Sequence, residues 1–207
     1  YHWFSCGELD QAAEAALDAG NNALRIGAFE RACSLFRLAV TCRPEALEAQ
    51  RKLAEGLVTS GRLTEAAPML LALAERAARP SRAEQLRREA GEHYMISGEL
   101  ERGLQVLQPL LMAAQLVYPE REAVARQQHS DAFARLARRG IVWVERSELE
   151  LSSGELARHD LYWSLCKGHM LNDIVRGGLF AAQSAALALE LGEPRRICRS
   201  LAVAGAV

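Results

Sequence analysis

The sequence lacks the features that mark several large classes of protein. Aromatic residues make up only 6% of the 207 residues, lysine occurs twice against 23 arginines, and the formal net charge is −1. Because a nearly neutral chain exerts no strong pull on polyanions, we expect neither nucleic acid nor an anionic membrane as a partner. The scarcity of aromatic residues also favours helices over sheets.

The chain also lacks the signals of secretion and membrane insertion. Its five cysteines are an odd number without a C-x-x-C pair, which argues against a disulfide framework and a zinc module. No apolar run reaches the roughly 18–20 residues of a membrane-spanning helix, and no signal peptide is visible. We therefore expect a cytoplasmic protein. Because the sequence begins without Met and ends in the apolar residues 201–207, we interpret it as a segment of a longer protein.

Alanine and leucine dominate what is present, with 67 residues between them. Both are strong helix formers, so the composition predicts an all-α protein. Small and large apolar residues recur along the first half with a period of about 34 residues. The first copy contains Gly20, Ala23, Gly27, Phe29, Ala32, Phe36, Ala39 and Pro44. The second contains Ala54, Leu57, Gly61, Leu63, Ala66, Leu70 and Leu73, and the third contains Gly91, Tyr94, Gly98, Leu100, Gly103, Leu107 and Leu110.

This spacing is that of a helix hairpin. Gly27, Gly61 and Gly98 are expected at equivalent turns, because glycine readily adopts the left-handed conformation that ends a helix. Small residues let the two helices approach closely, and large residues fill the neighbouring holes. Each hairpin leaves an apolar face that only the next hairpin can cover, which predicts a stacked, superhelical solenoid.

The first copy resembles the tetratricopeptide repeat pattern position for position. The resemblance implies three repeats and a partial N-terminal unit over residues 1–117, in a right-handed superhelical α-α solenoid. We expect residues 118–207 to continue it as degenerate hairpins, with an irregular connector near residues 141–154 and kinks at Pro68 and Pro109. Residues 160–197 also resemble the helical repeat region of large bacterial serine/threonine kinase and signal-transduction ATPase proteins. The capping-box spacing of Ser81 and Glu84 predicts the start of the third repeat.

Motifs for catalysis, cofactors and metals are absent from the sequence. No phosphate-binding glycine loop occurs, and Cys166 and His169 are too few for a metal site. Asn172-Asp173 lies within an apolar stretch, where we expect Asp173 to contact Arg176 or Lys167. The arginine-rich runs 79–88 and 121–139 contain interspersed acids, so we interpret them as solvated helix faces. The predictions are no catalytic residues, no cofactor and no metal.

In tetratricopeptide arrays the first helix of each hairpin lines a concave groove that holds a peptide. The resemblance places the candidate groove at Asn21, Arg25, Arg51, Glu55, Arg88 and Glu92. The family's clamp for a peptide carboxylate is poorly matched, because Leu17 and Glu89 replace basic residues. We therefore do not expect binding of chaperone tails.

Three functions remain open from the sequence. The first is a noncatalytic interaction and scaffold domain that holds a protein or peptide segment inside a larger bacterial signalling protein. The second is an intramolecular module that restrains an adjacent kinase or ATPase domain of the same chain. The third is a helical hydrolase with a site near His169, Asn172 and Asp173.

Overall fold

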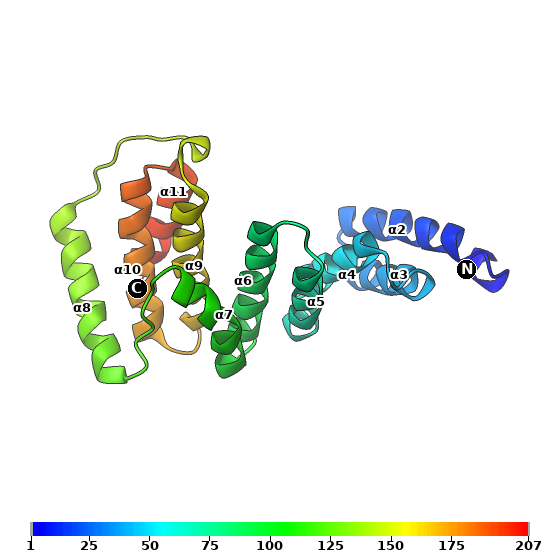
Figure 1. Cartoon of the computed structure of the whole chain (residues 1–207), viewed down its shortest axis with the longest axis horizontal. Helices are drawn as coiled ribbons and strands as arrows, with labels where there is room; N and C mark the ends of the chain where they lie inside the picture. Colours follow the sequence, from blue (N-terminus) through cyan, green and yellow to red (C-terminus); the bar gives the residue numbers. More distant parts are fainter. Residues whose placement is uncertain (1, 207) are drawn as a thin grey trace. The chain divides into compact units, whose positions relative to one another are not determined.

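The computed structural model describes residues 2–206, which contain α-helices, one short 3₁₀ helix and no strand. This confirms the all-α prediction (Figure 1). In chain order the helices are α1 His2–Ser5, α2 Leu9–Arg25, α3 Phe29–Cys42, α4 Leu47–Thr59, α5 Leu63–Glu75, α6 Pro80–Ile96, α7 Leu100–Ala113, α8 Glu122–Arg139, η1 Glu148–Glu150, α9 Ser153–His169, α10 Ile174–Leu191 and α11 Pro194–Ala204.

The three repeat glycines occupy equivalent turns, as predicted. Gly27, Gly61 and Gly98 have φ values of 76°, 75° and 92°. At each turn the amide after the glycine donates to the carbonyl five residues earlier, over 2.8, 2.8 and 2.9 Å respectively. This hydrogen bond and the one from the glycine amide satisfy carbonyls at the end of the helix in a Schellman motif. The same turn conformation therefore precedes the second helix of each hairpin.

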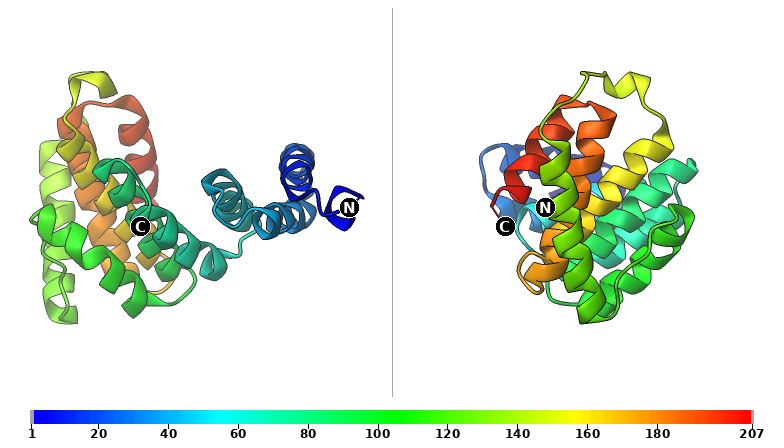
Figure 2. Two further views of the ribbon diagram at one scale, coloured as in Figure 1. Left: turned by 45° about the vertical axis from the view of Figure 1, so that its right-hand side comes forward. Right: turned by 90° about the vertical axis from the view of Figure 1, so that its left-hand side faces the viewer.

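The chain divides into two compact units at His93–Tyr94, inside α6. In the first unit each of α2, α3 and α4 packs on the next helix along the chain, and α2 also contacts α4; Figure 2 shows α2 and α3 side by side in blue. Phe36 of α3 is fully buried between Gly20 of α2 and Gly56 of α4. Gly20 gives the ring the space that the repeat pattern predicted for its small residues, and Gly56, which is not one of the pattern residues, gives it space on the other side.

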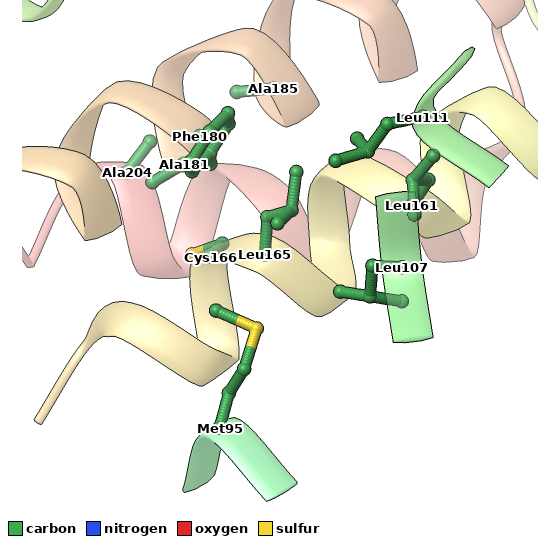
Figure 3. Close-up of a cluster of buried hydrophobic side chains, with 10 residues drawn as sticks. All are labelled: Met95, Leu107, Leu111, Leu161, Leu165, Cys166, Phe180, Ala181, Ala185 and Ala204. Atoms are coloured by element: carbon green, nitrogen blue, oxygen red, sulfur yellow. The ribbon is translucent and has the colours of Figure 1, made fainter. Parts of the chain in front are cut away.

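The second unit is built around α10, which packs against α8, α9 and α11. Its largest core cluster contains Met95, Leu107, Leu165 and Phe180 from four helices (Figure 3). Helix α9 contacts α7 and, through Gly168, the side chain of Met95 in α6. It therefore packs on the preceding hairpin as α4 packs on α2 and α3, while α8 is an extra helix placed against α10.

Some local predictions for the second half of the chain and for α6 are wrong. Helix α6 begins at Pro80, so Ser81 lies inside its first turn rather than capping it; proline suits this first position because it has no amide hydrogen to satisfy. Capping boxes occur instead at Ser147 and Ser152, before η1 and α9. Asn172 and Asp173 lie in the turn before α10 and not within an apolar helix.

The irregular connector is present as a segment without α-helix between α8 and α9. Pro68 and Pro109 lie inside α5 and α7 as expected. Among the described helices, α10 alone is long and apolar enough to cross a membrane, and 61% of it is buried inside the protein. That burial is also what the core helix of a globular unit shows.

Candidate functional site

The first unit contains an open pocket of about 370 Å³ between α4, α5 and α6. It is lined by Arg51, Ala54, Glu55, Val58, Thr59, Leu70, Leu73, Arg82, Leu86, Glu89 and His93. The lining residues on α6 recur at intervals of three and four, which places them on one face of the helix. The pocket therefore forms where a hairpin meets the first helix of the next one.

The floor of the pocket is apolar and its rim is charged. Leu70 and Leu73 of α5 and Leu86 of α6 are buried at the bottom, with the half-buried Val58 beside them. The Arg51 guanidinium at the rim donates to Glu48 over 2.6 Å, and this hydrogen bond holds the pKa of the Glu48 carboxyl below its usual range. An apolar floor inside a polar rim is the usual anatomy of a protein-binding surface.

The second arginine of the rim comes from α6. Arg82 donates to the Gln85 side chain over 2.8 Å, and Gln85 donates to Glu89 over 2.8 Å. All three side chains therefore form a chain of hydrogen bonds along one helix. Both charge signs are fixed at the rim before any ligand arrives.

The structure brings only two of the six predicted groove residues to this pocket. Arg51 and Glu55 line it. Arg88 and Glu92 are turned away and lie against each other at 3.9 Å, with the Glu92 side chain buried. Asn21 and Arg25 are exposed on α2, outside the pocket lining.

Arg82, Glu89 and His93 line the pocket but are not among the residues that the tetratricopeptide resemblance selects. The resemblance selects Arg88 and Glu92, whereas the side of α6 that faces α4 carries the residues one position later. The sequence signal for the correct face is Leu86. It lies between Ala83 and Ala90, which are also buried, so the residues about one turn before and after Leu86 border the same face of α6.

A second polar cluster lies in the second unit and has no local sequence motif. The His159 Nε2 atom is 3.1 Å from the Ser200 hydroxyl and 3.2 Å from the Ser184 hydroxyl, and the two hydroxyls are 2.8 Å apart. On the other side of the ring, Asp160 Oδ1 is 3.4 Å from Nδ1 and accepts a 2.6 Å hydrogen bond from Arg199. The side chains of His159, Ser184 and Ser200 are fully buried.

These distances match a nucleophile, base and acid, but the environment does not. A serine nucleophile must reach its substrate, and both hydroxyls are closed off by α9, α10 and α11. Burial lowers the pKa of His159, which keeps the imidazole neutral and able to share hydrogen bonds with the serines. The cluster is therefore a buried hydrogen-bond network that joins three helices.

The residues of the hydrolase hypothesis point to separate partners. His169 Nε2 shares a 2.9 Å hydrogen bond with the Tyr118 hydroxyl, and Asn172 donates to the Met95 carbonyl over 3.2 Å. Asp173 accepts a 3.0 Å bond from the Arg176 amide at the start of α10 and forms an ion pair with its guanidinium. The expected contact with Arg176 is confirmed.

Within residues 2–206, no group of three or more His, Cys, Asp or Glu side chains is placed so that it could hold a metal ion. The five cysteines described are all free, and Cys6 and Cys198 are exposed.

No family model, curated protein or solved structure matches this chain. Its resemblance to tetratricopeptide repeats rests on the residue pattern alone. The pocket and its charges carry the functional inference.

Proposed function

We propose that this chain is a noncatalytic interaction domain of tetratricopeptide type, whose hairpins stack as a right-handed superhelix and whose α4–α5–α6 pocket binds a peptide segment of a protein partner. One observation carries the proposal: an open pocket with an apolar floor and charges of both signs lies between successive hairpins. The resemblance of residues 160–197 to signalling proteins supports a regulatory or sensing role in a larger protein of that kind.

A photocrosslinking amino acid at Thr59, on the pocket rim, tests where the partner binds. Thr41 is the matched control, because it is an exposed threonine near the end of α3 and outside the pocket. We expect a discrete crosslinked product from position 59 and none from position 41. The crosslinked peptide, identified by mass spectrometry, then supplies the ligand for affinity measurements.

The double variant Arg51→Glu/Arg82→Glu should lower the affinity for that peptide at least about tenfold, a loss of about 1.4 kcal/mol of binding free energy. Arg31→Glu/Arg135→Glu reverses the same charge on exposed residues outside the pocket and should retain the affinity. Circular dichroism establishes that both variants are folded. If the pocket variant binds as tightly as the control, or if positions 41 and 59 crosslink equally, the proposed site is wrong.

A further inference from the structure

The two walls of the α4–α5–α6 pocket differ in how their charges are paired. On α4, Arg51 donates to Glu48 through Nε and Nη2 over 3.0 and 2.6 Å, and it lies 3.8 Å from Glu55. Glu55 in turn accepts a 3.1 Å hydrogen bond from Lys52. The charges of this wall are therefore neutralised within their own helix.

On α6, the charged side chains that line the pocket have a neutral partner instead. Arg82 donates to the amide oxygen of Gln85, and Glu89 accepts from the amide nitrogen of Gln85, both over 2.8 Å. Within residues 2–206, neither Arg82 nor Glu89 forms an ion pair. One cation and one anion at the rim are therefore available to a ligand.

Arg82 also occupies an unfavourable place in its helix. It lies in the first turn of α6, which contains no acidic residue. The amides of a first turn carry partial positive charge, so that a cation there is disfavoured and an anion is favoured. A ligand carboxylate beside Arg82 would be attracted both by the guanidinium and by the start of the helix.

The pocket has a defined polarity, because α4 and α6 begin at the same end of it. Arg76, directly after α5, donates to the side chain of Gln50 near the start of α4 over 3.2 Å. The short link from the end of α5 leads at once to the start of α6 (Figure 1). Arg51 and Arg82 therefore lie towards the beginning of both helices, and Glu89 lies towards the other end.

The separation of the two α6 charges favours a helical ligand. Arg82 and Glu89 are seven positions apart, which is about 10.5 Å along a helix, and Leu86 of the floor lies between them. On a second helix the same distance separates residues i and i+7, and residue i+4 points to the same side. In an extended chain this distance spans about three residues, and the first and last of these side chains point to opposite faces.

Resting on the peptide binding proposed above, we propose that the ligand is an amphipathic α-helix of a protein partner. One face of this helix carries an acidic, an aliphatic and a basic residue, spaced as i, i+4 and i+7. The acid pairs with Arg82 and the base with Glu89. The pocket of about 370 Å³ is smaller than two turns of a helix about 10 Å across, so the helix lies over its mouth and inserts the aliphatic side chain.

Two synthetic alanine-based helices labelled with fluorescein test this pairing by fluorescence anisotropy. The matched helix carries Glu, Leu and Lys at i, i+4 and i+7, and the mismatched helix carries Lys in place of that Glu. The wild-type chain should bind the matched helix about fivefold more tightly, because an ion pair at the rim is replaced by a repulsion of similar size. Moving the second charge of the matched helix from i+7 to i+5 turns it to another side and should lower its affinity.

Variants of the chain then assign each charge to its partner. Arg82→Glu should reverse the preference, since the Lys of the mismatched helix then meets a carboxylate. Arg31→Glu, which changes the net charge equally on an exposed residue outside the pocket, should keep the wild-type preference. Glu89→Lys should favour a helix with Glu at both positions, whereas Glu84→Lys, exposed on α6 outside the pocket, should not. Circular dichroism establishes that the four variants are folded.

The proposal is overturned if the wild type binds both helices equally, if Arg82→Glu keeps the preference of Arg31→Glu, or if neither helix binds. A partner segment that crosslinks at Thr59 in an extended conformation would leave peptide binding at the pocket intact and refute the helical ligand. A reversed preference of Arg82→Glu without any crosslinked partner would support the helical ligand and contradict the proposed function. The two failures are therefore distinguishable.

Discussion

At the scale of single residues, His169 has a pKa far from its ordinary value. Its ring is buried in a stack with Tyr118 and Phe180, and burial lowers its pKa to about 4. Burial likewise raises the pKa of Tyr118 to about 12, so the pair shares its hydrogen bond as two neutral groups at physiological pH. A proton on His169 would place a charge where water cannot solvate it.

His169 should therefore make the fold acid-sensitive. The unfolded chain has the ordinary histidine pKa near 6.5 and binds the proton first, so the contribution of neutral His169 is complete above that pH. It declines by about 1.4 kcal/mol per pH unit as the pH falls towards 4, roughly 3 kcal/mol in all. Unfolding of the second unit measured between pH 7 and 4 should show this slope.

The variant His169→Gln removes the titrating group while keeping a partner for Tyr118. We expect lower stability at pH 7 and a shallower slope below it. His129→Gln, at a half-buried position of α8, removes an imidazole without touching the stack and is the matched control. Equal slopes for His169→Gln and the wild type would show that the acid sensitivity comes from other groups.

At the scale of helices, the contact between α2 and α3 depends on the absence of a side chain at Gly20. A Cβ atom there would overlap the ring of Phe36, which is fully buried and cannot move aside. We expect Gly20→Ala to destabilise the first unit by about 1–3 kcal/mol despite the better helix propensity of alanine. The measurement is the midpoint of thermal unfolding followed by circular dichroism.

Alanine substitutions at two further glycines serve as comparisons for Gly20→Ala. At Gly56 a Cβ would lie 3.3 Å from Phe36, so a small shift accommodates it and a smaller loss is expected. At Gly154, in α9, nothing lies within 4 Å, and alanine should be neutral or slightly stabilising. If Gly20→Ala behaves like Gly154→Ala, the close approach of α2 and α3 does not limit stability.

The same scale shows how far the sequence could predict the fold. The turns at Gly27, Gly61 and Gly98 were predictable because a left-handed helix end is a local requirement that glycine meets best. The network of His159, Ser184 and Ser200 was not, because its members come from three helices and share no spacing. The pocket was predictable only in part. The repeat pattern selects Arg51 on α4, whereas the side of α6 that lines the pocket depends on how α6 packs against the preceding hairpin.

At the scale of the whole molecule, the packing is local. The most extensive helix contacts join neighbours along the chain or helices one apart, as α2 with α4 and α8 with α10. In proteins built this way, stability is approximately a sum of nearest-neighbour terms, so separate parts can open at different free energies. The division at His93–Tyr94 adds a boundary at which cooperativity can fail.

This leads to a reciprocal prediction for hydrogen exchange. Gly20→Leu should speed amide exchange in α2, α3 and α4 while leaving α9 and α10 protected, because its overlap with Phe36 is confined to the first unit. Gly168→Leu, which would press on Met95, should do the reverse. If either variant raised exchange uniformly from α2 to α11, unfolding would be a single cooperative transition. The nearest-neighbour account of this chain would then be wrong even with every hairpin correctly placed.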